Sequence, residues 1–212
     1  MAMISNYSEL KSELSAYLFH SRLANRYDNC TRMFEAAANR RLRVYPMEAV
    51  DLLTTVNGVT ALPSEYLAWR TVLWTGRTPF AELDYVHPAY LQSTYVELEH
   101  GNPKLFTIEG TGNNATSPNV KIRPVNDTAN AYEFHYYHRI PSIVDNARNW
   151  LLDSWPDAYL FGVLTELSAV QRNAEMAQLY KARRDETFAE IIQLSALSTG
   201  ATSSKVRTAE YF

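Results

Sequence analysis

Apolar side chains recur at helical spacing near both ends of the chain and lose that spacing in the middle. A first helix is predicted from Ser8 to about His20, because Ser8 followed by an acid is typical of a helix start. A second helix is predicted from Asn25, and Pro46 closes it. Each has one apolar face, formed by Leu10, Leu14, Tyr17 and Leu18 in the first helix and by Tyr27, Cys30, Phe34, Ala37, Ala38 and Leu42 in the second.

From residue 47 to residue 141 the pattern changes to short runs rich in β-branched and aromatic side chains. Asn57-Gly58 is the strongest hairpin signal in the chain and predicts a strand on either side. Tyr66–Trp74 is predicted to be a buried strand. Further strands are predicted at 80–86, 105–108, 120–124 and 132–140, with a short helical turn at 87–91. The connecting turns leave no room for crossover helices, so the middle lobe is predicted to be antiparallel β structure.

Helical spacing returns after Pro141. Ser154, Pro156 and Asp157 predict a helix start, with a capping side chain, a proline in the first turn and an acid at the positive end. The helix that follows is apolar around nearly its whole circumference. It therefore needs burial on most sides, either at the centre of a bundle or under another subunit. A last helix begins near Asn173 and has an ordinary apolar stripe, formed by Met176, Leu179, Tyr180, Phe188, Ile191 and Ile192.

These elements predict an α+β fold, in which amino- and carboxyl-terminal helices form a bundle with an inserted antiparallel β lobe. The predicted boundaries are 1–46 and 142–197 for the helical bundle, 47–141 for the β lobe and 198–212 for an extended carboxyl-terminal tail. The tail has too little apolar content to fold alone. Its last residues, among them Val206, Tyr211 and Phe212, are suited to anchoring in a groove on a partner.

Composition favours one folded unit with two lobes, because the 212 residues are 46% apolar and 12% aromatic. The net charge of -3 gives no overall attraction to DNA or anionic lipid, so any contact with DNA must be local. No apolar run is long enough for a membrane helix, and the start lacks a signal-peptide pattern, so we expect a cytosolic protein. Cys30 is the single cysteine and is expected to be a buried apolar residue.

Patterns that would support catalysis or metal binding are weak. His135 and His138 are three positions apart on a predicted strand, so they are expected on opposite faces, where they cannot share a metal. Gly110 and Gly112 lack the third glycine and the following helix of a phosphate-binding loop. Neighbouring acids on the predicted strands are expected to be solvated. The sequence therefore predicts no catalytic residue, no cofactor and no metal.

Arginine is concentrated in and around the second predicted helix. Six arginines against two acids give this stretch a local charge of +4, and they are Arg22, Arg26, Arg32, Arg40, Arg41 and Arg43. One interpretation is a solvated helix face whose cations favour the negative end of the helix dipole. The others are pairing with acids of another subunit, or contact with a phosphate backbone without sequence readout.

Five short segments follow one another along the chain in a distinctive order, and they are Glu35–Val44, Leu62–Leu67, Tyr136–Pro141, Asn149–Leu152 and Pro156–Gly162. Their order and spacing resemble those of the head-to-tail adaptor, or connector, proteins of tailed bacteriophages. The resemblance covers residues 4 to 195. It departs from the family pattern at Arg41, where many relatives carry an acid.

The resemblance implies a structural virion protein and not an enzyme. Such adaptors are made in the host cytoplasm and form a ring, usually of twelve copies, in the neck of the virion beneath the portal. The ring joins the portal to the tail or nozzle protein and helps to retain packaged DNA, with no membrane partner. The resemblance also implies that the carboxyl-terminal tail docks on the portal or on a neighbouring copy, with Val206, Arg207, Tyr211 and Phe212 as the candidate docking residues.

Two other functions stay open from the residues themselves. The first is a DNA-binding module that uses the arginine-rich second helix, whose affinity would fall steeply as salt concentration rises. The second is a cell-wall-degrading enzyme, which would need one carboxyl group with a pKa raised by an apolar pocket.

Overall fold

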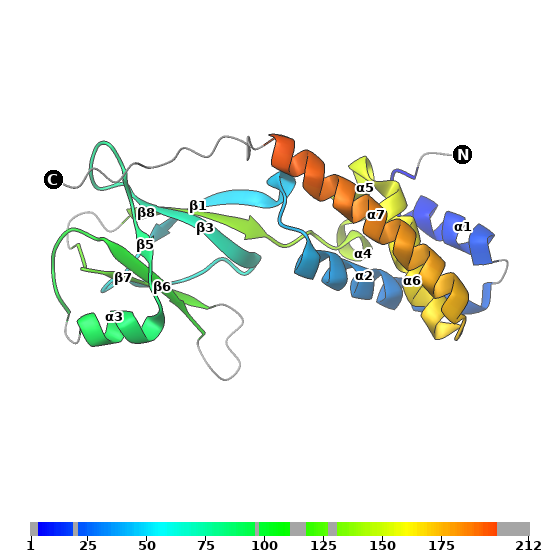
Figure 1. Cartoon of the computed structure of the whole chain (residues 1–212), viewed down its shortest axis with the longest axis horizontal. Coiled ribbons are helices and arrows are strands. Elements are labelled where there is room, and N and C mark those ends of the chain that lie inside the picture. The colour runs from blue at the N-terminus through cyan, green and yellow to red at the C-terminus, as the bar shows by residue number, and fades with distance from the viewer. Residues whose placement is uncertain (1–3, 19–20, 96–97, 111–117, 127–130, 199–212) are drawn as a thin grey trace. The chain divides into compact units, whose positions relative to one another are not determined.

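Helices from the two ends of the chain pack in one unit, and the strands between them form a second unit (Figure 1). The computed structural model describes all residues except 1–3, 19–20, 96–97, 111–117, 127–130 and 199–212. The helical unit is made of Met1–Met47 and Ile140–Phe212, and the β unit is made of Glu48–Arg139. The predicted mixed α+β fold is therefore confirmed.

The first helix, α1 (Tyr7–Leu18), starts one residue before the predicted position. The amide oxygen of Asn6 accepts the backbone N–H of Glu9 at 3.0 Å, so Asn6 caps this helix instead of Ser8. The Glu9 carboxylate in turn accepts the backbone N–H of Ser5 at 2.7 Å. The Glu9 side chain thus binds the residue before the cap, whereas in a capping box it would bind the N–H of the cap residue itself.

The second helix, α2 (Tyr27–Arg41), starts two residues after the predicted Asn25, because a 3-10 helix, η1 (Ser21–Arg26), precedes it. Its carboxyl end is closed by the backbone N–H of Leu42, which donates to the carbonyl of Ala38 at 2.8 Å. The other helices of this unit are η2 (Tyr45–Met47), α4 (Ile143–Asn146), α5 (Trp150–Ser154), α6 (Pro156–Val170) and α7 (Ala174–Ser198).

The predicted cap of α6 is wrong. Ser154 is the last residue of α5, and no side chain caps the amino end of α6. Pro156 does occupy the first turn, as predicted. The Asp157 carboxylate accepts a hydrogen bond from the Thr187 hydroxyl at 3.0 Å, so it links α6 to α7. Asn173 caps α7 by accepting the backbone N–H of Met176 at 3.2 Å.

Helix α6 lies at the centre of the helical unit, where it contacts α1, α2, α5 and α7. Its fully buried side chains include Tyr159, Val163, Leu164 and Leu167. This contact pattern decides between the two alternatives left by its all-round apolar surface. The helix is shielded by its own chain and needs no second subunit to cover it.

The β unit contains two four-stranded sheets, with strand orders β1-β8-β3-β4 and β2-β7-β6-β5. Their elements are β1 (Glu48–Thr54), β2 (Val59–Ala61), β3 (Tyr66–Trp74), β4 (Ala81–Glu82), β5 (Asp84–Tyr85), α3 (Pro88–Thr94), β6 (Leu105–Glu109), β7 (Asn119–Arg123) and β8 (Ala131–His138). Alternating side chains of both sheets form one core, whose fully buried members include Val72, Phe106, Val120, Ile122, Tyr132 and Phe134.

The Asn57-Gly58 turn forms as predicted, with φ of 53° and 69°, and the Val56–Val59 bridge closes it. The strands on its two sides do not continue as one hairpin, however. β1 pairs with β8 in one sheet and β2 pairs with β7 in the other. The turn therefore carries the chain from one sheet to the next.

Two details of the predicted β lobe are wrong. β5 and β6 pair in parallel, whereas the other strand pairs are antiparallel. A parallel pair needs a long crossover, and the connection 86–104 supplies one that includes α3. β3 is not a wholly buried strand, since Val72 and Trp74 are buried but Trp69 is 38% exposed. One face of its sheet packs on the core of the β unit, and the opposite face is partly exposed.

Candidate functional site

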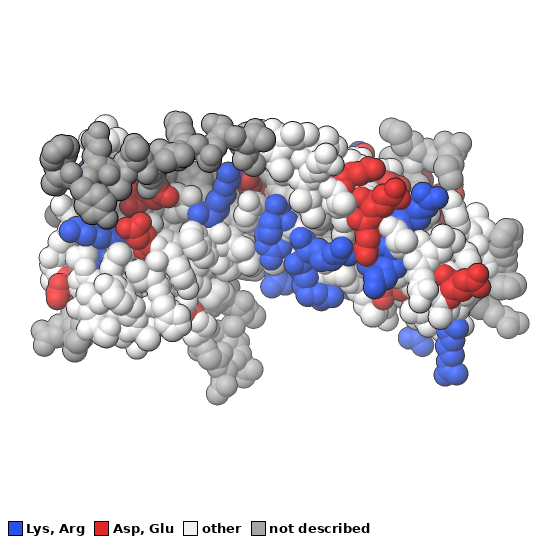
Figure 2. Space-filling view, viewed as in Figure 1, with Lys and Arg blue, Asp and Glu red and all other residues white. Residues whose placement is uncertain are grey.

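The arginine-rich stretch begins in η1, where the side chain of Arg22 lies outside the described part of the structure. The other five arginines of the predicted cluster are exposed, and they are Arg26, Arg32, Arg40, Arg41 and Arg43. Figure 2 shows lysine and arginine side chains gathering over α2. Three of these arginines form hydrogen bonds or ion pairs within the described part of the helical unit, and the other two do not.

Arg32 joins α2 to the short helix α4. Its guanidinium donates two hydrogen bonds to the carboxylate of Asp145, at 3.0 and 2.7 Å. These hydrogen bonds lower the pKa of Asp145 and raise that of Arg32. Both side chains are at least half exposed, so water screens the pair and its effect on stability is small.

Arg41 and Arg43 act at the carboxyl end of α2. Arg41 pairs with Asp185 of α7 and lies over the ring of Phe188, 5.3 Å from its centroid. Burial raises the pKa of Asp185, but hydrogen bonds from Arg41 and Arg184 outweigh burial and lower it overall. The guanidinium of Arg43 donates to the backbone carbonyl of Asn39 at 2.7 Å, so Arg43 satisfies an acceptor that the helix end leaves open.

Arg26 and Arg40 have no hydrogen bond or ion pair with another described residue. Met33 lies between them in the sequence and is 57% exposed. The outward side of α2 is therefore a mixed surface, with two free cations and one large apolar side chain, and not a continuous row of guanidinium groups.

A buried polar network lies beneath α2. The Glu35 carboxylate accepts the backbone N–H of Ile143 at 2.8 Å and the Tyr159 hydroxyl at 3.2 Å. The same hydroxyl accepts a hydrogen bond from the Asn149 amide at 2.6 Å. The Asn149 side chain also caps α5, because its oxygen accepts the backbone N–H of Leu152 at 2.9 Å. The network holds α2, α4, α5 and α6 in one arrangement.

Burial sets the protonation behaviour of this network. It raises the pKa of Glu35, although hydrogen bonds from Ser142, Ile143 and Tyr159 act in the opposite direction. Burial and the nearby Glu35 charge also raise the pKa of Tyr159. Both groups are buried and bind one another and the backbone of neighbouring helices, so their perturbed pKa values fit a structural network.

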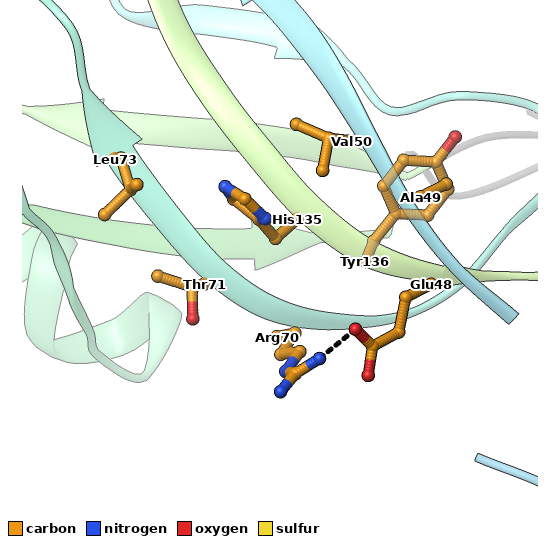
Figure 3. A pocket seen from close by; sticks show the side chains of 8 residues that line it. All are labelled: Glu48, Ala49, Val50, Arg70, Thr71, Leu73, His135 and Tyr136. Carbon is orange, nitrogen blue, oxygen red and sulfur yellow. Dashed lines mark ion pairs between the residues drawn. The ribbon is translucent and has the colours of Figure 1, made fainter. Parts of the chain in front are cut away.

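The β unit has an open depression of about 450 Å³ on the outer face of β1, β8 and β3 (Figure 3). An ion pair between Glu48 of β1 and Arg70 of β3 lies at its edge. Val50 and Leu73 supply apolar surface, and His135 lies between them on β8. The residues offer no nucleophile activated by a neighbouring base, so the depression has the character of a contact surface.

Metal binding has no support in the described ranges, in which no group of three His, Cys, Asp or Glu side chains could hold a metal ion. His135 and His138 occupy β8 three positions apart, hence on opposite faces. Cys30 is a buried free cysteine, as predicted, and burial raises the pKa of its thiol. A thiol of this kind is a poor nucleophile.

The sequence matches the SU10 adaptor protein family over residues 5–208. The chain belongs to this family of phage head-tail adaptors. The predicted resemblance to that group is confirmed. No match to a curated protein is found. Membership assigns the adaptor a structural role as a virion component, and it points away from catalysis.

Three of the segments that carry the family resemblance meet in the buried network. Glu35 comes from the first segment, Asn149 from the fourth and Tyr159 from the fifth. Gly162, also in the fifth, leaves room for the ring of Phe34, because a Cβ there would lie 2.1 Å from it. The buried residues of these segments therefore build the frame of the adaptor.

The predicted tail residues Val206, Arg207, Tyr211 and Phe212 lie outside the described residues. None of the described helices is long and apolar enough to cross a membrane.

Sequence reasoning missed Asp145 and Asp185 as partners of the arginines. They are 113 and 144 residues away from Arg32 and Arg41, and no local pattern connects positions so far apart.

Proposed function

We propose that the adaptor assembles as a ring of twelve copies between the portal and the tail or nozzle of a tailed phage. The observation that carries the proposal is membership of a head-tail adaptor family over residues 5–208. In the assembled neck the ring helps to retain packaged DNA, and the carboxyl-terminal tail docks on the portal or on a neighbouring copy. Closure of a ring multiplies the effect of modest contacts between copies.

Exposed apolar side chains support a role in assembly. The core of each unit is closed, yet Met33, Val50, Leu52 and Leu197 are all more than half exposed. Single exposed apolar residues are ordinary, but Val50 and Leu52 share one face of β1, which is an edge strand. Such surfaces are suited to contacts with other copies or other virion proteins.

The pairing of the arginines weighs against a DNA-binding module. A module that tracks a phosphate backbone needs several free cations on one surface. Arg32, Arg41 and Arg43 are bound within the helical unit, which leaves Arg26 and Arg40 free among the described arginines of the cluster. We expect weak DNA binding without the steep salt dependence of many phosphate contacts. A steep fall in affinity between 50 and 200 mM salt, of about 1,000-fold or more, would support the module instead.

The decisive experiment for the ring is a mass measurement of the purified adaptor with and without the portal ring of its own phage. We expect a discrete complex that contains one portal ring and one full ring of adaptors, with twelve as the expected number. A complex with one or two adaptors per portal ring, or no complex at all, would refute the proposal.

A further inference from the structure

One exposed face of the helical unit is basic and lies on α2 and its N-cap residue, Arg26, whose backbone is still in the helical region. Arg26, Met33 and Arg40 are spaced seven residues apart, which is two helical turns, so they line up on one side. Asn29 and Ala36 fall between them, and all five residues are exposed. We call this set the basic face. It contains no acid, and its two guanidinium groups have no partner among the described residues.

A second exposed face is acidic and lies on α7. Its residues follow one another at intervals of four or seven, which keeps them on one side of the helix, and they are Glu175, Leu179, Glu186, Glu190 and Leu197. All are exposed, Leu179 by 52% and Leu197 by 64%. We call this set the acidic face. Arg183, four residues after Leu179 and seven before Glu190, lies on the same side and pairs with Glu186 at 3.6 Å, with both side chains more than 60% exposed. Three carboxylates therefore share this side with one guanidinium.

The two faces are complementary in charge and in pattern. Each has charged residues at intervals with an apolar side chain between them, Met33 on α2 and Leu179 on α7. Both helices pack on α6 through their other sides, so the two faces are left over after the core has formed. Figure 2 shows Asp and Glu side chains over α7 and Lys and Arg side chains over α2.

We propose that a second copy of this chain docks on these faces, with the basic face of one copy packed on the acidic face of the next. The inference rests on the ring proposed above and names the surfaces that would close it. A contact between two different surfaces passes from copy to copy around a ring, whereas a self-complementary surface stops at a dimer. Opposite charges set the pairing and its register, and the central apolar side chains exclude water.

A second copy fits the basic face better than a nucleic acid does. Met33 and Ala36 occupy the middle of that face, and neither side chain can bind a phosphate group. Two guanidinium groups separated by an exposed methionine suit a protein surface, where arginine and methionine are both enriched.

Charge reversal tests the proposal. Variant A carries Arg26→Glu and Arg40→Glu, and variant B carries Glu186→Lys and Glu190→Lys. The self-association of the full-length protein is measured by sedimentation at low salt over a range of concentrations. We expect the association constant of A alone and of B alone to fall on the order of 100-fold, because like charges then meet at the contact. A 1:1 mixture of A and B should associate again, since A is acidic on both faces and B is basic on both.

The control variant carries Arg77→Glu and Lys104→Glu, which change the net charge as in A at exposed positions of the β unit. It should associate like the wild type. A variant that combines all four substitutions of A and B should also associate, and 1 M salt should weaken every productive pair. Far-UV circular dichroism checks that each variant is folded.

Three outcomes would overturn the inference: A or B associating like the wild type, a mixture of folded A and B that stays apart, or a wild type that remains monomeric at every concentration. Loss of DNA binding in A without any change in association would overturn it in favour of a phosphate contact. The ring itself is judged separately on the portal. If A and B still load the portal with full rings, this interface is wrong and the proposed function stands.

Discussion

Gly162 is occupied by glycine because the ring of Phe34 fills the space beside it. A Cβ at this position would lie 2.1 Å from one ring carbon and 2.2 Å from another. The ring cannot move away, since it is fully buried and packs edge-on against Tyr159, with centroids 4.9 Å apart. A close approach of α2 to α6 therefore depends on this one missing side chain.

Gly162→Ala should lower the free energy of unfolding by about 2 kcal/mol through overpacking. The loss should appear even though alanine favours a helix over glycine by about 1 kcal/mol. Urea denaturation followed by circular dichroism measures it. Gly110→Ala is the matched control, because a Cβ there meets nothing within 4 Å. An equal effect of the two substitutions would contradict the packing argument.

Glu35 makes stability depend on pH in a predictable direction. Its pKa is raised in the folded protein, chiefly by burial, so the native state holds this proton more tightly than the unfolded chain does. The ionised form therefore costs stability at neutral pH. That cost is relieved as the pH falls through the folded pKa towards the unfolded value of about 4.3.

The variant Glu35→Gln should lack this dependence. We expect the unfolding free energy of the wild type to rise relative to that of the variant as the pH is lowered from 7 towards the unfolded-state pKa of about 4.3. Chemical denaturation of both proteins at several pH values measures the difference, in which the contributions of other groups cancel. Parallel curves for the two proteins would show that Glu35 titrates normally.

At the scale of elements, the Asn57-Gly58 turn carries the chain between two sheets. Gly58 has a φ of 69°, and a Cβ there would lie 2.6 Å from the backbone oxygen of Ile122. The Ile122 N–H in turn donates to the carbonyl of Gly58 at 2.8 Å. Backbone conformation and close approach both require glycine at this turn.

Gly58→Ala should destabilise the β unit by about 1 to 3 kcal/mol, because it adds strain at a positive φ to a clash with backbone. Urea denaturation followed by circular dichroism measures the loss. Gly101→Ala serves as the control, since the nearest atom to a Cβ there is 3.6 Å away. A control that loses as much stability as Gly58→Ala would rule out this explanation.

At the scale of the whole molecule, the helical unit completes its core from both ends of the chain. α6 is enclosed by α1, α2, α5 and α7, and α7 ends at Ser198. The fold of the described residues is therefore closed without residues 199–212. We therefore expect the segment 199–212 to act in assembly.

Deletion of 199–212 should leave the midpoint of thermal unfolding unchanged and reduce binding of the adaptor to the portal. Differential scanning calorimetry measures the first quantity, and co-sedimentation with the portal measures the second. Alanine at Tyr211 and Phe212 in the full-length chain is the finer test of the docking residues. A deletion that melts early would show that the tail belongs to the core.

The sequence alone determined the order of the elements, the position of most helices and strands, the buried character of Cys30 and the family. Periodicity, turn residues and motif order are properties of the sequence itself, so they can be recognised without knowing which residues are in contact. They placed β3 and the start of α6 with little error. They failed at the cap of α6 and at η1, because a side chain near a helix end is no proof of a cap.

Only the tertiary structure decided which groups meet. The all-round apolar surface of α6 was compatible with a central helix or with a subunit contact, and packing within the chain selected the first. Arg32 and Arg41 became intramolecular partners of Asp145 and Asp185, which leaves Arg26 and Arg40 for other contacts. Pairing between positions more than a hundred residues apart depends on the fold that brings them together, and that information has no local signature in the chain.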